Sequence, residues 1–365
     1  MAVRGLPARP DRDPQALAAR GGQPSGCVRL KPPRLPGWPP TIAAMRTRLT
    51  DILEVEHPVM LAGMGGVSYH RVVAAVSDAG GFGCLGASTM SHERMVDEIA
   101  ATVASTDRPF GVDLLTAAPQ DMAAKVSAII DGGATVFVAG LGVPREVVEQ
   151  CHDGGLLVVN MCGKVSHAVQ AVDAGCDIVV AQGTEAGGHT GQVATMALVP
   201  QVVDAVGHLV PVVAAGGIFD GRGLAAALSL GADGIWVGTC FIATPEAQAV
   251  AGYKERILAS SEDGTVITRA YTGKTCRVLR TSYVDEFERG GGVAEPFPGQ
   301  YIRSLQDGVN HLGGDEQTEG VDPDREFMPA GQGIGAIHGL VPAGDLVRRF
   351  VAEAEAALDR VASLR

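Results

Sequence analysis

The chain has 365 residues, 46% of them hydrophobic, enough to bury a sizeable core in one large α/β domain or two smaller ones. Its formal net charge is −12 and no long basic stripe interrupts it, which argues against a nucleic-acid-binding protein. Because no run of about eighteen apolar residues occurs, no segment is expected to span a membrane.

The first 44 residues differ in composition from the rest of the chain. They contain nine of the 21 prolines and an excess of basic residues, without the apolar segment of a secretory signal. This composition predicts a disordered N-terminal extension over residues 1–44. A more ordinary sequence begins at Met45, so we hypothesise that translation starts there and that residues 1–44 are dispensable.

The seven cysteines are scattered along the chain, and no Cys-x-x-Cys pair occurs. Neither a disulfide framework nor a structural zinc site is therefore expected, and the chain is predicted to be cytoplasmic. Cys84, Cys162 and Cys240 lie in or beside apolar segments and are interpreted as small core residues. No cluster of His, Cys and Asp has the spacing of metal ligands, so no metal is expected.

From residue 58 to about residue 238, short β-like runs alternate with amphipathic helical segments. The predicted strands are 59–62, 82–85, 110–114, 135–139, 156–160, 178–181, 210–214 and 234–237. The helical segments are 70–79, 92–104, 120–130, 145–153, 164–174, 195–206 and 221–230. Val, Ile and Leu fill the strands without strict alternation, as in parallel strands buried on both faces. The pattern predicts an α/β fold, a (β/α)₈ TIM barrel, with a doubly wound open sheet as the rival.

The regular alternation ends near residue 247. Residues 247–260 are predicted to form the last outer helix, and the barrel is assigned to 45–261. Residues 262–335 are glycine-rich and irregular, with a β-like piece near 266–268, and are interpreted as an insertion over the barrel mouth. The C-terminal segment 336–365 contains an amphipathic helix over 342–364 that is expected to pack on the barrel.

In a barrel of this kind, function concentrates in the loops that follow the strands. The loop after the sixth strand is rich in glycine and contains His189, whose side chain suits proton transfer near neutral pH. The alternative is a surface histidine beside a glycine turn, but the position of the loop on the catalytic face of the barrel favours a catalytic role for His189.

Glycines also follow the seventh and eighth strands, as Gly216-Gly217 and Gly238-Thr239. Loops at these two places commonly bind a phosphate through backbone amides, whereas glycines needed only for tight turns are the alternative. A further glycine-rich turn, Ala62-Gly63-Met64, follows the first strand. Residues 331–336 loosely match the dinucleotide-binding fingerprint, but no clear strand precedes them, so this match is discounted.

These motifs together resemble the nitronate monooxygenase family, formerly called 2-nitropropane dioxygenases, from about Met45 to the C-terminus. The string Glu185-Ala186-Gly187-Gly188-His189 is the most specific of them. The resemblance implies noncovalently bound FMN and oxidation of alkyl nitronates by O₂ to carbonyl compounds and nitrite. It also implies that His189 is the active-site histidine.

The resemblance further implies which residues bind the flavin. Ala62, Gly63 and Met64 would contact it through backbone groups, and Gln182 and Gly187 would lie near its ring and ribityl chain. The phosphate would be held by Gly216, Gly217, Gly238 and Thr239, with Trp236 and Val237 leading into the last of these turns. Many members have Asn where this chain has Asp113 at the end of the third strand. An ionised carboxylate there would disfavour an anionic reduced flavin, whereas a protonated one can donate a hydrogen bond.

The same motifs resemble the flavin-dependent enoyl-acyl-carrier-protein reductase II group and related NAD(P)H:quinone reductases. The segments that carry this second resemblance are 195–199, 253–258 and 330–332. An NAD(P)H-dependent flavin reductase is therefore the first alternative. A barrel that binds flavin or another phosphorylated ligand without catalysis is the second.

Overall fold

The computed structural model describes residues 45–116 and 120–364. The predictions for residues 1–44, a disordered extension and a dispensable segment before Met45, lie outside the described residues.

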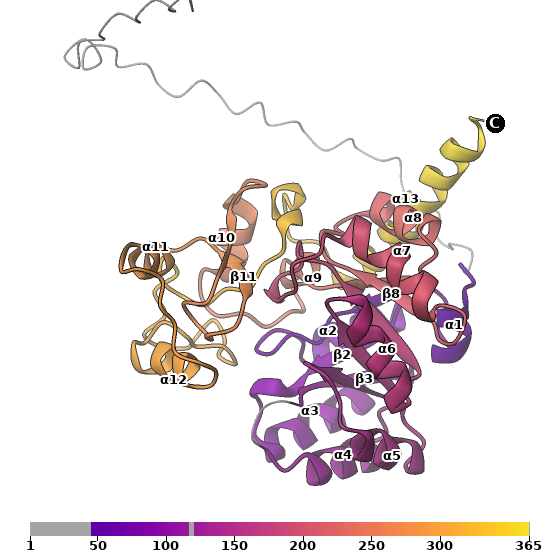
Figure 1. Cartoon of the computed structure of the whole chain (residues 1–365), viewed down its shortest axis with the longest axis horizontal. Helices are drawn as coiled ribbons and strands as arrows, with labels where there is room; N and C mark the ends of the chain where they lie inside the picture. Colours follow the sequence, from indigo (N-terminus) through magenta and orange to yellow (C-terminus); the bar gives the residue numbers. More distant parts are fainter. Residues whose placement is uncertain (1–44, 117–119, 365) are drawn as a thin grey trace, which may run out of the picture. The chain divides into compact units, whose positions relative to one another are not determined.

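Eight parallel strands form a (β/α)₈ barrel, which confirms the predicted fold class (Figure 1). The strands are β1 (Val59–Leu61), β2 (Gly83–Gly86), β3 (Phe110–Leu115), β4 (Val136–Gly140), β5 (Leu157–Cys162), β6 (Ile178–Gln182), β8 (Val212–Ala215) and β9 (Gly234–Val237). They pair in the order β1-β9-β8-β6-β5-β4-β3-β2. A bridge between Met60 and Phe82 joins the two outermost strands, which excludes the doubly wound open sheet.

The outer helices follow the predicted segments to within a few residues at each end. They are α2 (His70–Asp78), α3 (His92–Ser105), α4 (Met122–Asp131), α5 (Arg145–Asp153), α6 (Val165–Ala174), α7 (Thr195–Val206) and α8 (Gly221–Ser229). A short helix, α1 (Arg48–Leu53), precedes the first strand and begins with a capping box at Thr47. Its Leu49 is fully buried in the same cluster of apolar side chains as Met60 and Trp236, which fill the barrel interior.

The prediction of an outer helix over residues 247–260 is wrong in extent and in place. The helix there, α10 (Tyr253–Ala259), begins only after Gly252, whose φ of +79° interrupts the helical backbone. The helix that completes the outer ring is α13 (Ala343–Ala362), which packs on α8 and α2. Contact between α8 and α13 is so close that a Cβ on Gly221 would lie 2.4 Å from the backbone nitrogen of Ala354.

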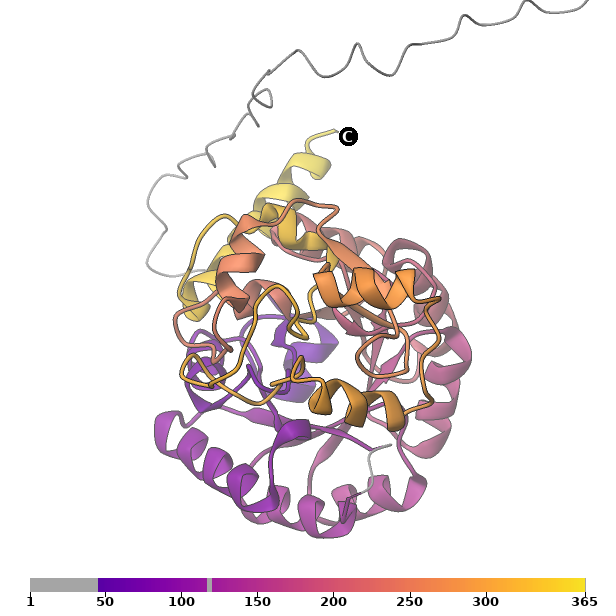
Figure 2. The ribbon, with the colours of Figure 1, turned by 90° about the vertical axis from the view of Figure 1, so that its left-hand side faces the viewer.

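Residues 262–335 are more regular than the sequence indicated. They contain the strands β10 (Thr265–Thr268) and β11 (Cys276–Leu279), the helices α11 (Ser282–Arg289) and α12 (Gly299–Gln306), and most of the 3₁₀ helix η3 (Gln332–Ala336). We call residues 262–335 the cap. In Figure 2, α11 and α12 (orange) lie in front of the ring of barrel helices.

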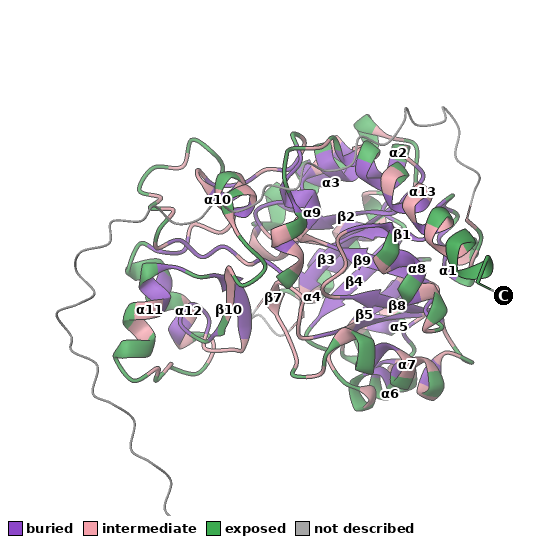
Figure 3. Cartoon of the chain, turned by 90° about the horizontal axis from the view of Figure 1, so that it is seen from above, coloured by how far each residue is buried: buried purple, intermediate pink, exposed green. Residues whose placement is uncertain are grey.

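One strand of the cap sheet comes from the barrel itself. The two-residue strand β7 (Gly188–His189) belongs to the loop after β6, and it pairs with β11 in a second, antiparallel sheet ordered β10-β11-β7. The apolar strands form the buried centre of the barrel, and exposed residues lie on the outer helices and on the cap (Figure 3). Within the described ranges, no helix has both the length and the apolar character needed to cross a membrane.

Candidate active site

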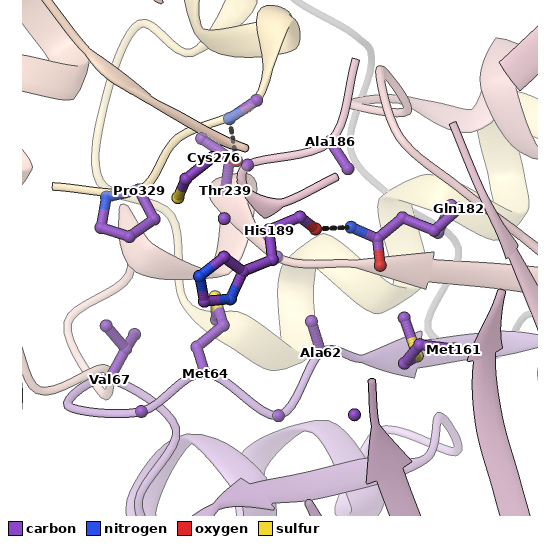
Figure 4. A pocket seen from close by; sticks show the side chains of 18 of the residues that line it. Ala62, Met64, Val67, Met161, Gln182, Ala186, His189, Thr239, Cys276 and Pro329 are labelled. Atoms are coloured by element: carbon purple, nitrogen blue, oxygen red, sulfur yellow. Dashed lines mark hydrogen bonds between the residues drawn. The ribbon is translucent and has the colours of Figure 1, made fainter. Parts of the chain in front are cut away.

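A cavity of about 360 Å³ opens at the C-terminal ends of the barrel strands, beneath the cap. Every residue that the sequence marked as a candidate lines it: Ala62, Gly63, Met64, Asp113, Gln182, Gly187, His189, Gly216, Gly217, Trp236, Val237, Gly238 and Thr239. The structure therefore brings the glycine turns after β8 and β9 to the same space as His189. Figure 4 shows the side chains of His189 and Thr239 in the wall of this cavity. Such a volume is within the usual range for small-molecule sites.

Backbone N–H groups without partners gather at one end of the cavity. The N–H groups of Gly217, Ile218 and Gly238 donate to no other atom of the described residues. Gly216 and Gly217 have φ values of +105° and +71°, so the turn after β8 adopts a conformation that favours glycine. Clustered amide donors of this kind provide a binding site for an anion.

The hydroxyl of Thr239 and the late segment at Gly331 complete this end of the cavity. The Gly331 N–H donates to the Thr239 Oγ1 over 3.0 Å, which leaves the hydroxyl proton of Thr239 available to a ligand. The next residue, Gln332, donates its N–H to the carbonyl of Glu185. The segment discounted as a dinucleotide fingerprint is thus a 3₁₀ turn, and its glycines Gly331 and Gly333 line the cavity.

Asp113 lies at the opposite side of the cavity, in the C-terminal half of β3. It is 8% exposed, and burial is the one influence on its carboxyl group, which makes no hydrogen bond within the part of the chain that the structure describes. Gly63 lies directly against it, since a Cβ on Gly63 would be 2.2 Å from the Asp113 Cβ. Burial raises the pKa of Asp113 from 3.8 to about 8, so this carboxyl group is neutral at pH 7 and can donate a hydrogen bond.

His189 is held from both the barrel and the cap. On the barrel side, Gln182 donates its Nε2 to the His189 carbonyl oxygen over 2.8 Å (Figure 4). On the cap side, β7 pairs with β11 so that His189 lies opposite Cys276. The imidazole Nε2 lies 3.0 Å from the Oγ1 of Thr272, in the loop between β10 and β11.

The His189 imidazole is neutral at physiological pH. Burial, with a smaller contribution from the nearby Lys274 cation, lowers the pKa of His189 from 6.5 to about 4. The Lys274 ammonium lies over the ring of Phe297, 4.8 Å from its centroid. The sequence left the protonation state of His189 open, and the structure indicates an imidazole that can accept a proton.

The cap supplies an apolar roof that the sequence did not reveal. Its side chains in the cavity wall are Thr272, Cys276, Phe297, Tyr301, Leu312, Phe327 and Pro329. Burial also raises the pKa of Tyr301 and of the Cys276 thiol, so both are neutral at pH 7. Together with neutral Asp113 and His189, these groups leave an uncharged cavity that suits a substrate with an apolar chain. No local signal marks these positions, because they are brought to the barrel by tertiary packing.

Comparison with known proteins identifies a matching family. The model of the nitronate monooxygenase family matches residues 46–124 and 119–353. Among curated proteins, the 5-hydroxy-7a-methyl-1-oxo-octahydro-1H-indene-4-carboxyl-CoA dehydrogenase of Mycobacterium tuberculosis is 41% identical over 247 residues. That alignment covers 67% of this chain and 69% of the dehydrogenase.

Two solved structures resemble the chain closely. FabK of Thermotoga maritima superposes with a TM-score of 0.79 at 34% identity, covering 88% of this chain and 100% of FabK. The nitroalkane oxidase of Streptomyces ansochromogenes superposes with a TM-score of 0.74 at 30% identity, covering 86% of this chain and 100% of the oxidase.

Proposed function

The chain belongs to the nitronate monooxygenase family, and from this premise we propose that it binds FMN and oxidises alkyl nitronates with O₂. It is a flavin-dependent oxidoreductase, since relatives across this family are named as monooxygenases and dehydrogenases. The products would be a carbonyl compound and nitrite. The observation that carries the proposal is that one cavity contains both a neutral His189 and backbone amides after β8 and β9 that donate to nothing in the described part of the chain.

The residues of the cavity fit FMN. The N–H groups of Gly217, Ile218 and Gly238, together with the Thr239 hydroxyl, would hold its phosphate. The ring and ribityl chain of FMN would contact the backbone of Ala62–Met64, the side chain of Gln182 and the neutral carboxyl group of Asp113. FMN held there would supply the redox chemistry between the substrate and O₂.

The chain's own residues bind the substrate and move its proton. A neutral nitroalkane must lose the proton on the carbon beside its nitro group, and the neutral His189 imidazole would accept it. A nitronate needs no such step, so its oxidation depends on His189 only for positioning. The roof residues Phe297, Tyr301 and Phe327 would cover the alkyl chain and exclude water from the site.

An anaerobic reductive titration tests the proposal. We expect the FMN-loaded protein to be bleached by an alkyl nitronate and to form nitrite and a carbonyl compound when O₂ is admitted. NADH or NADPH should leave the flavin oxidised over the same time. Prompt bleaching of the flavin by NAD(P)H, with none by nitronate, would contradict the proposal and indicate a reductase instead.

A NAD(P)H-dependent flavin reductase is the second candidate, and the likeness to FabK favours it. The segment at Gly331 also belongs to the sequence resemblance with the reductase II group, and it lies beside the proposed phosphate site. Because two relatives are named as dehydrogenases of a carboxyl-CoA compound, acyl thioesters belong among the compounds tested as electron donors to the oxidised flavin.

Replacing Gly217 with Ala should weaken FMN binding through the phosphate. The substitution places a Cβ on a residue with φ of +71°, and that Cβ would lie 3.2 Å from Glu185 Cβ, so the turn and its amides must shift. We expect the dissociation constant of FMN, measured by fluorescence quenching, to rise about tenfold or more while that of riboflavin changes little.

The matched control is Gly155→Ala, which introduces the same backbone strain at φ of +79° with nothing within 4 Å of the new Cβ. This variant should bind FMN as the wild type does. Equal losses for FMN and riboflavin in the Gly217 variant would show that the turn does not hold the phosphate.

A further inference from the structure

The hydroxyl of Thr272 is the sole hydrogen-bond partner of the His189 ring within the described residues. Thr272 is 2% exposed, and its Oγ1 lies 3.0 Å from Nε2 of His189. A second hydrogen bond joins the loop of Thr272 to the segment that contains His189, because the Thr190 N–H donates to the Thr275 carbonyl. The position of Thr272 is therefore set by the same β7–β11 pairing that positions the histidine.

The hydrogen-bonding capacity of one hydroxyl group decides how the two side chains interact. A threonine hydroxyl has one proton to donate and two lone pairs that accept. The Lys274 N–H donates to the Thr272 Oγ1 over 3.3 Å, and the Lys274 carbonyl oxygen accepts from it over 3.3 Å. The Thr272 proton is thus directed to Lys274, and one lone pair remains for the His189 Nε2.

The alternative arrangement takes from a carbonyl group its hydrogen bond within the described residues. If the Thr272 proton pointed to the His189 Nε2 instead, the Lys274 carbonyl oxygen would lose its only partner among the described residues. The arrangement that satisfies every group requires a proton on Nε2.

We infer that Thr272 is a positioning residue that fixes His189 as the Nε2–H tautomer and so reserves Nδ1 as the proton acceptor. Burial of the ring, and to a smaller extent the Lys274 cation, opposes addition of a second proton and keeps the imidazole neutral. On the proposed function, on which this role rests, Nδ1 takes the proton from the carbon of a neutral nitroalkane. The C–H electron pair then moves onto the nitro group, giving an imidazolium and a nitronate.

Nitrogen-15 NMR of the FMN-loaded protein, labelled at its histidines, tests the tautomer directly. His189→Ala identifies the resonance. We expect the wild type and Thr272→Ser to show a protonated Nε2 and an unprotonated Nδ1. The nearly isosteric Thr272→Val, which removes only the hydroxyl, should lose this preference. An Nδ1–H tautomer in the wild type, or an unchanged Nε2–H tautomer in Thr272→Val, would overturn the inference.

Kinetics provide the second measurement. In Thr272→Val we expect kcat/KM for a neutral nitroalkane to fall about tenfold or more, while kcat/KM for the preformed nitronate changes little. Thr272→Ser should restore the nitroalkane activity. Equal losses with both substrates would indicate a merely structural role. If the wild type oxidises neither substrate, the proposed function fails, and the NMR spectra still decide the role of Thr272.

Discussion

Replacing Asp113 with Asn is expected to stabilise the flavin-free protein, and to do so increasingly as the pH rises from about 4 to about 8. The pKa of Asp113 is raised by burial to about 8 in the folded protein, against 3.8 for the free side chain. Between these values the folded state binds a proton that the unfolded state releases, so stability falls as the pH rises. The difference between wild type and variant should grow by up to about 1.4 kcal/mol per pH unit.

Urea unfolding of the flavin-free protein at pH 5, 6, 7 and 8 measures this effect. Asp131→Asn is the matched control, because Asp131 is exposed at the end of α4 and its replacement should leave the pH dependence unchanged. A difference between wild type and Asp113→Asn that does not change with pH would show that Asp113 is ionised in the folded protein.

The same substitution should remove a pH dependence from FMN binding. A protonated Asp113 can donate a hydrogen bond to the flavin, whereas the ionised form above about pH 8 cannot. Asn has an amide that donates at every pH, so the variant should bind FMN with equal affinity at pH 7 and pH 9. The wild type should bind more weakly at pH 9.

Replacing His189 with Ala is expected to lower the turnover of a neutral nitroalkane by about 10²-fold or more, the usual contribution of a general base. Oxidation of a preformed nitronate should fall much less, because that substrate has already lost its proton. Burial lowers the pKa of His189 to about 4, so the neutral form is present at every pH above this value. The wild-type kcat/KM for nitroalkane should therefore show no histidine inflection between pH 5 and pH 8.

His208→Ala is the control for this experiment, because His208 is exposed at the end of α7 and should not affect either substrate. Steady-state rates of nitrite formation from the two substrates give the comparison. An unchanged rate for the nitroalkane in His189→Ala would show that His189 does not transfer the proton. An inflection near pH 6.5 in the wild-type profile would show that the pKa of His189 has its ordinary value.

The sequence by itself determined the barrel and the location of its glycine turns. Each strand is a short apolar run and each helix an amphipathic segment, and both patterns arise from neighbours along the chain. The turns at Gly216 and Gly238 follow such strands directly, so their common position at one end of the barrel follows from the parallel arrangement. The same reasoning placed His189 on that face.

Tertiary structure alone decided how the cap completes the site. The partner of His189 is Thr272, 83 residues away in the chain, and no local pattern marks that pairing. The last outer helix is likewise α13 rather than the segment before the cap, because Gly252 interrupts the earlier segment and α13 packs on both α8 and α2. The neutral states of Asp113 and His189 also come from burial by residues distant in sequence. Periodicity reports which face of a segment is buried, whereas a pKa depends on which groups surround it.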